Sequence, residues 1–141
     1  MKLKQLWVTS EEPISLRLPL MASRVSCGFP SPADDFLDSK LDLNKFLITH
    51  PAATIFAWAQ GDSLKDRGID DGDLLIVDRA VNVDHHAIVV AAIDGELTCK
   101  VWDKKRGYLL PANDKYQPID IKGQESLLIE GVVVHSIKCH Y

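Results

Sequence analysis

The sequence has no apolar run long enough to cross a membrane. Its longest strongly apolar stretch, Ala87–Ile93, falls far short of the ~18 residues that a spanning helix needs. The N-terminal segment, Met1–Ser10, also lacks the apolar core of a secretory signal. We therefore expect no membrane segment and a cytoplasmic location.

Cysteine is scarce. The chain has three cysteines, Cys27, Cys99 and Cys139, which is an odd number without close spacing. A small secreted domain held by disulfides usually has an even, closely spaced set. The pattern instead indicates reduced thiols, which agrees with a cytoplasmic protein.

Basic charge is sparse as well. The 16 Lys and Arg residues are outnumbered by 20 Asp and Glu residues, and the net charge is −4. Basic residues occur in short groups such as Lys104–Arg106, whereas a nucleic-acid-binding face needs clustered basic charge to replace counterions on phosphates. We expect no direct DNA binding.

Candidate metal ligands lack the spacing of a metal site. Successive residues on a strand point to opposite faces, so His85 and His86 are interpreted as part of a polar turn. The histidines and cysteine within 135–140 lack metal-ligand spacing, and the acidic residues within 70–73 lack the ligand pattern of a calcium loop. We expect no metal and no other cofactor.

Apolar residues make up 46% of the chain, which is enough for a packed core. The first 35 residues contain four prolines and no sustained periodicity, so we predict an arm with little regular structure, although 14–18 could pair with an edge strand. A partial helical stripe follows over 34–50, with Asp42 as a candidate N-cap and Pro51 as a boundary. We expect an arm with a short helix over 1–50 and a compact domain over 51–141.

After Pro51 the sequence alternates between short apolar segments and turn residues. Asp94-Gly95 lies between two apolar runs and is a strong signal for a two-residue hairpin. This pattern predicts a mainly β protein with a small curved sheet or partial barrel. The predicted strands are Thr54–Ala59, Leu74–Asp78, Ala87–Ile93, Glu96–Trp102, Tyr108–Pro111 and Leu127–Ile137.

A candidate nucleophile lies at the end of the first of these strands. The segment Ala59–Leu64 marks the change from an apolar strand to a polar turn, in which Gly61 allows a tight bend. A serine held at such a turn, Ser63, can present its hydroxyl to a substrate, and nearby backbone N–H groups can stabilise a developing oxyanion. By itself, Gly-Asp-Ser is equally typical of an ordinary turn.

A candidate base lies on a later strand. Alternation places Thr98, Lys100 and Trp102 on one face of the strand over 96–102. A lysine between apolar positions is more commonly an edge residue or one that reaches to water. The functional alternative is a serine–lysine dyad in which Ser63 is the nucleophile, Lys100 is the general base and Thr98 holds the amine by a hydrogen bond.

The dyad hypothesis has a physical requirement. A lysine in water has a pKa near ~10.4 and is charged at neutral pH, whereas a general base must be uncharged. Burial against apolar side chains disfavours the charged form of a lysine and can meet this requirement.

Taken together, these motifs resemble the LexA-type serine–lysine autoproteases, and most closely their UmuD branch. The likeness covers about residue 26 to the C-terminus, and the first 25 residues match poorly. The chain departs from the usual pattern at Leu64, where the family commonly has methionine, and at His85-His86-Ala87, where it tends to have Gly-Asp. The matching motifs include Cys-Gly-Phe-Pro-Ser-Pro-Ala at 27–33, Asp-Leu-Asn at 42–44, Gly-Asp-Ser at 61–63, Asp-Gly-Asp-Leu-Leu-Ile-Val-Asp at 71–78 and Gly-Val-Val at 131–133.

The resemblance implies a site and a biological setting. Ser63 would be the nucleophile, Lys100 the base, and the backbone N–H groups of Asp62 and Ser63 the oxyanion hole. The bond that is cut would be Cys27–Gly28 of the chain's own arm. Cleavage would be stimulated by the RecA filament on single-stranded DNA in the SOS response. The processed homodimer would then act with a UmuC-type Y-family polymerase in translesion synthesis and mutagenesis.

Three alternatives remain to be compared with this hypothesis. A polymerase-docking subunit of the same fold, without activity, is distinguished from an autoprotease by substitution of Ser63. A LexA-like repressor needs a helix-turn-helix before the cleavage site, and residues 1–27 carry no helical pattern, so we do not expect one. A signal peptidase uses a related pair but needs a membrane segment, which we do not find here.

Overall fold

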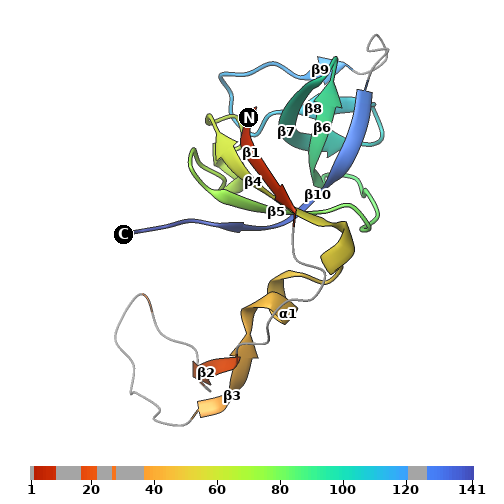
Figure 1. Cartoon of the computed structure of the whole chain (residues 1–141). Helices are drawn as coiled ribbons and strands as arrows, with labels where there is room; N and C mark the ends of the chain where they lie inside the picture. The colour runs from red at the N-terminus through yellow and green to blue at the C-terminus, as the bar shows by residue number, and fades with distance from the viewer. Residues whose placement is uncertain (1, 9–16, 22–26, 28–36, 121–126) are drawn as a thin grey trace.

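The computed structural model describes residues 2–8, 17–21, 27, 37–120 and 127–141. The described part is mainly β, as predicted, with one short α-helix and two 3-10 turns. Figure 1 shows a curled sheet to which the N-terminal strand belongs, and a separate two-stranded sheet that lies away from it beyond the helix. The elements are β1 (Lys2–Val8), β2 (Arg17–Met21), β3 (Leu37–Asp42), α1 (Leu43–Leu47), η1 (Pro51–Ala53), β4 (Thr54–Gln60), η2 (Lys65–Arg67), β5 (Leu74–Asp78), β6 (Ile88–Ile93), β7 (Glu96–Asp103), β8 (Tyr108–Leu110), β9 (Ile119–Asp120) and β10 (Leu127–Ile137).

The large sheet has eight strands in the order β1-β4-β5-β10-β6-β7-β8-β9, and the recorded pairings are antiparallel. A further pairing joins β1 to β7, so the sheet curls until its first strand meets its sixth (Figure 1). This confirms the predicted curved sheet or partial barrel. The six strands predicted from sequence are all present, with ends that differ by at most one residue.

The hairpin between β6 and β7 confirms the prediction made from Asp94-Gly95. Both residues have positive φ, 50° and 81°, as a type I′ turn requires, and Ile93 pairs with Glu96 across it. This turn fixes the register of the two strands, and the register places Lys100 opposite Val89. The candidate base therefore lies on a strand that is paired on both sides, with β6 and with β8.

The N-terminal part differs from the prediction. Strand β1 pairs with β4, and β2 pairs with β3, so the expectation of little regular structure before residue 35 is wrong for 2–8 and 17–21. Within the predicted pairing segment, 14–16 lies outside the described residues. For β1 the explanation is pairing with the edge of the large sheet, because an edge strand offers unpaired N–H and C=O groups whatever the local pattern of its partner. Strand β2 instead forms a separate two-stranded sheet with β3.

The predicted helical region is also shorter than expected. Residues 37–42 form β3, and α1 occupies only Leu43–Leu47. Asp42 is the N-cap, as predicted, and its carboxylate accepts a hydrogen bond from the Asn44 N–H at 3.1 Å. The helix ends before Pro51, also as predicted. The division into 1–50 and 51–141 stays a prediction.

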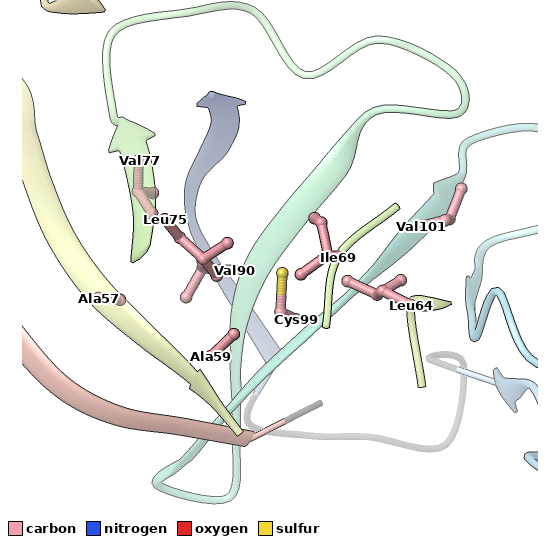
Figure 2. Packing of buried hydrophobic residues seen from close by; sticks show 9 residues of the cluster. All are labelled: Ala57, Ala59, Leu64, Ile69, Leu75, Val77, Val90, Cys99 and Val101. Atoms are coloured by element: carbon pink, nitrogen blue, oxygen red, sulfur yellow. The ribbon is translucent and has the colours of Figure 1, made fainter. Parts of the chain in front are cut away.

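The main core cluster fills the inside of the curled sheet and fixes the turn that carries Ser63. It combines side chains of β4 to β7 with two buried residues of the loop between β4 and β5, Leu64 and Ile69 (Figure 2). Moving this loop out of the core would cost free energy, because the burial of each of its two aliphatic side chains stabilises the fold by about 1.5–3 kcal/mol. The cluster consists of Ala57, Ala59, Leu64, Ile69, Leu75, Val77, Val90, Cys99 and Val101.

Candidate active site

The turn after β4 is built as the sequence predicts. Gly61 has φ of 99°, in the left-handed region that glycine adopts without strain, and its N–H donates to Asp71 Oδ1 at 2.8 Å. Ser63 follows with only 1% of its surface exposed, and Leu64 anchors the chain in the core directly after it. The serine is therefore held from both sides at the edge of the core.

Lys100 lies on β7 with 7% of its surface exposed, and its Nζ donates a hydrogen bond of 2.9 Å to Ser63 Oγ. The structure thus brings together two side chains that are 37 positions apart in sequence. The alternative of a lysine that reaches to water does not describe this residue. A serine hydroxyl and a lysine amine at this distance are within range for direct proton transfer.

The strand around Lys100 follows the predicted alternation. Cys99 and Val101 lie in the main core cluster, and Trp102 packs against a second cluster that includes Val89. Burial raises the pKa of the Cys99 thiol to about 12. The thiol next to the candidate base is therefore protonated at physiological pH and is not a competing nucleophile.

A segment after β8 clamps the turn that carries Ser63. The Ala112 N–H donates to the Ser63 carbonyl at 2.6 Å, and Asn113 Nδ2 donates to the Asp62 carbonyl at 2.8 Å. Tyr116 Oη donates to Asp62 Oδ1 at 2.6 Å. The same segment also reaches the base, because Lys100 Nζ lies 5.5 Å from the centre of the Tyr116 ring.

The bond between Tyr116 and Asp62 changes the acidity of both groups. The hydrogen bond from Tyr116 is the largest cause that lowers the pKa of Asp62, and the same bond raises the pKa of Tyr116. Asp62 is therefore ionised and Tyr116 is a neutral donor over the physiological range. Sequence reasoning missed both Asn113 and Tyr116, because it treated the segment as a turn and no local pattern links it to residue 62.

The chain is similar in sequence to known proteins over most of its length. Residues 19–134 match the family model described as Peptidase S24-like. The chain is 45% identical to the protein ImpA of Salmonella typhimurium over 120 residues, which cover 84% of this chain and 82% of ImpA. It is also 40% identical to the protein MucA of Escherichia coli over 125 residues, which cover 87% of this chain and 86% of MucA.

The chain belongs to the peptidase S24 family. Within the family it is a UmuD-type protein of the LexA group of autoproteases. A LexA repressor of Acidithiobacillus ferrooxidans is 41% identical over 122 residues, which cover 83% of this chain but 58% of the repressor. The chain therefore matches only part of that longer protein.

The remaining predicted site residues of this S24 protein stay predictions. Thr98 is half-buried on β7, two positions before Lys100 and opposite Ala91, and its role in holding the amine is untested. The backbone N–H groups of Asp62 and Ser63 are still the predicted oxyanion hole. Cys27 is exposed, whereas Gly28 lies outside the described residues.

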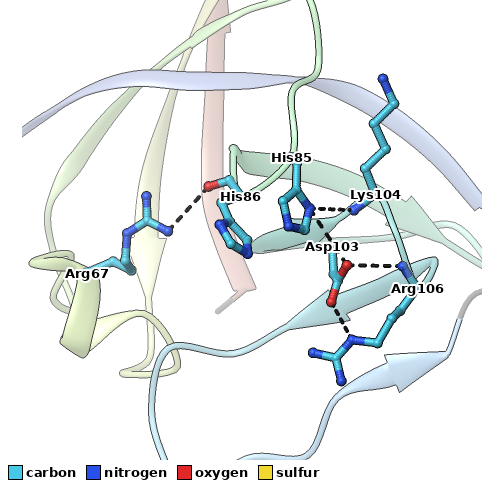
Figure 3. A network of polar contacts seen from close by, with 6 residues as sticks. All are labelled: Arg67, His85, His86, Asp103, Lys104 and Arg106. Atoms are coloured by element: carbon cyan, nitrogen blue, oxygen red, sulfur yellow. Dashed lines mark hydrogen bonds and ion pairs between the residues drawn. The ribbon is translucent and has the colours of Figure 1, made fainter.

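His85 and His86 lie in a polar network at the C-terminal end of β7 (Figure 3). Their rings are 3.7 Å apart, and His85 Nδ1 accepts a hydrogen bond from the Lys104 N–H at 3.2 Å. Burial is the main cause that lowers the pKa of His85, followed by the charge of His86. In the described part of the chain, no three His, Cys, Asp or Glu side chains are grouped in a way that could hold a metal ion.

Hydrophobic helices long enough to span a bilayer are not found among the described residues.

Proposed function

We propose that this chain is a self-cleaving serine endopeptidase in which Ser63 is the nucleophile and Lys100 the general base. The observation that carries the proposal is the 2.9 Å contact between Lys100 Nζ and Ser63 Oγ, made by two buried side chains. Membership of the S24 family supports the same reaction class. The bond that is cut is Cys27–Gly28.

The reaction begins when the uncharged amine of Lys100 accepts the proton of the Ser63 hydroxyl. The Ser63 oxygen attacks the carbonyl carbon of Cys27, and the oxyanion that forms is stabilised by the backbone N–H groups of Asp62 and Ser63. The Cys27–Gly28 bond then breaks, and Lys100 gives its proton to the leaving amine of Gly28. A water molecule, deprotonated by Lys100, hydrolyses the ester on Ser63 and leaves a carboxylate on Cys27.

The substrate is part of the same chain or of a second copy's arm. Tethering replaces a bimolecular encounter and contributes several kcal/mol to lowering the barrier. A competent state with uncharged Lys100 and the arm in place is a minor population in the resting protein, and a partner that binds it better raises its occupancy. We assign this role to the RecA filament on single-stranded DNA, on the basis of the resemblance to UmuD.

We also assign a role to the cleavage product on the basis of the resemblance to UmuD. Residues 28–141 form a homodimer that joins a UmuC-type Y-family polymerase in translesion synthesis during the SOS response. Removal of residues 1–27 takes away β1 and β2 and so uncovers the edges with which they pair. Newly exposed strand edges change which partners can bind.

The test is incubation of the purified chain with RecA filament on single-stranded DNA, followed by mass spectrometry of the products. We expect fragments 1–27 and 28–141 from the wild type, and a loss of roughly 10³-fold or more in rate for Ser63→Ala and for Lys100→Ala. Matched controls are Ser136→Ala and Lys104→Ala, at exposed positions, which should cleave at the wild-type rate.

Each contrary result has a clear meaning. Cleavage of Ser63→Ala at the wild-type rate removes Ser63 from the mechanism, and a cut at another bond refutes the assigned site. No cleavage of a folded wild type, with a filament that cleaves another member of the family, leaves the alternative of a docking subunit without peptidase activity.

A further inference from the structure

Tyr116 is a side chain that contacts both halves of the proposed dyad site. Its hydroxyl donates to Asp62 Oδ1 at 2.6 Å, next to the nucleophile, and its ring lies 5.5 Å from Lys100 Nζ. Tyr116 as a whole residue is 43% exposed, so it lies at the surface beside the site and is not part of the core. Its own backbone is fixed, because the Tyr116 N–H donates to the Asn113 carbonyl at 3.2 Å.

The ring and the hydroxyl act on different groups. The face of an aromatic ring attracts a cation but has no comparable attraction for a neutral amine. The ring therefore favours the charged form of a neighbouring lysine, which is the form that cannot act as a base. The hydroxyl instead holds Asp62, whose carbonyl is also held by Asn113, and so fixes the backbone directly before Ser63.

We propose that Tyr116 is a positioning residue with two separable actions: its ring restrains Lys100 in the charged resting form, and its hydroxyl fixes the turn that presents Ser63. The proposal rests on the proposed function, in which Lys100 must lose a proton before Ser63 attacks. It assigns part of the low activity of the resting protein to an exposed side chain that sequence reasoning had not singled out.

Three titratable groups beside the dyad lie outside the pH range of the test. Cys99 has a thiol pKa of about 12, and the pKa of Tyr116 is raised by its bond to Asp62. Asp62, which has Lys65 and Lys115 nearby, has a lowered pKa and is ionised well below neutral pH. Cysteine thiols ordinarily titrate between about pH 7 and about pH 10, and Cys27 is at the proposed scissile bond. Because every variant keeps Cys27, the difference in midpoint between two variants, and not the midpoint of one, reports on Lys100.

The experiment compares Tyr116→Phe with Tyr116→Leu, because both lack the hydroxyl and only the first keeps the ring. Self-cleavage is followed without filament across this pH range. We expect the midpoint of the rate profile to lie about half a pH unit lower in Tyr116→Leu than in Tyr116→Phe, which makes the leucine variant about threefold faster at neutral pH. In Tyr116→Phe we expect a lower plateau rate than in the wild type and the same midpoint.

The controls are Tyr141→Phe and Tyr141→Leu, at a fully exposed tyrosine, and both should match the wild type. Equal midpoints for the two Tyr116 variants would overturn the action of the ring. A plateau in Tyr116→Phe equal to that of the wild type would overturn the action of the hydroxyl. Far-ultraviolet circular dichroism of each variant shows whether it is folded before its rate is interpreted.

A second measurement does not depend on cleavage. In a Ser63→Ala background the chain stays intact, and the Cε resonance of Lys100 follows its protonation by NMR. We expect the midpoint of this resonance to be lower with Tyr116→Leu than with Tyr116→Phe, by the same half unit or so. If the NMR midpoints differ in this way but the parent chain is never cleaved, the action of the ring is supported and the proposed peptidase activity is contradicted. Cleavage of the parent chain with equal NMR midpoints contradicts the ring's action alone.

Discussion

Lys2 of β1 lies opposite Thr98 of β7, two residues before Lys100 on the same strand. Strand β1 pairs along its other edge with β4, which leads into the Ser63 turn. The N-terminal strand therefore lies between the two strands that bring the proposed nucleophile and the proposed base to the site (Figure 1). It also lies upstream of the bond that we propose is cut.

Removal of residues 2–8 should expose one edge of β4, because β1 and β5 are its two neighbours in the sheet. We predict faster amide hydrogen exchange across Thr54–Gln60 in the shortened chain, measured by mass spectrometry, because edge amides open more readily than paired ones. Removal of Tyr141 alone is the control. Equal exchange of β4 in the shortened and full-length chains would contradict this pairing.

The turn after β7 depends on Asp103, which is 3% exposed and accepts two hydrogen bonds from Arg106 (Figure 3). Arg106 Nε donates to Oδ2 at 2.7 Å, and the Arg106 N–H donates to Oδ1 at 3.1 Å. The hydrogen bond from the Arg106 side chain is the largest cause that lowers the pKa of Asp103. The folded state therefore favours the ionised carboxylate over the protonated one.

The lowered pKa of Asp103 gives the stability of the folded state a pH dependence of known sign. A carboxylate with a lowered pKa in the folded state contributes stability that is present above its ordinary pKa of ~3.9 and is lost as the pH falls through the lowered value. We predict that Asp103→Asn lowers the melting temperature at neutral pH and that the gap to the wild type narrows below about pH 4. Asp114→Asn, at an exposed position, should show a much smaller gap. A gap that widens with acid would contradict the assignment.

Strand β10 approaches β5 closely at Gly131. A Cβ atom at this position would lie 2.8 Å from Val77 Cγ1 and 3.1 Å from the Asp78 carbonyl oxygen. We predict that Gly131→Ala lowers the free energy of unfolding by about 1–3 kcal/mol, measured by urea denaturation, because an overpacked core must shift. The neighbouring Glu130→Ala removes only a long ion pair with Arg79, at 3.6 Å, and should cost less than about 1 kcal/mol. Equal losses in the two variants would argue against a close approach.

The strands after Pro51 could be predicted because their signals are local. Apolar segments ended by glycine and aspartate turns place each strand, and the positive φ of Asp94 and Gly95 is a property of that dipeptide. Strand β1 could not be predicted in this way. Its pairing depends on an edge of β4 that exists only once the sheet has formed, and prolines elsewhere in the arm pointed to irregular structure.

The site was predictable in part. Ser63 and Lys100 were each singled out from local pattern and paired as one of two alternatives. The family resemblance then favoured the pair, because no rule of spacing joins residues 37 positions apart. The clamp formed by Asn113 and Tyr116 was missed for the same physical reason. Its hydrogen bonds to Asp62 span more than 50 positions of the chain.

The most direct test of the central claim is the rate of self-cleavage at Cys27–Gly28 as a function of pH, measured by intact mass. In the wild type we predict a rate that rises with pH, because the base must be uncharged, and a rate lower by roughly 10³-fold or more in Ser63→Ala and in Lys100→Ala. Fragments 1–27 and 28–141 formed by either variant at the wild-type rate would contradict the account.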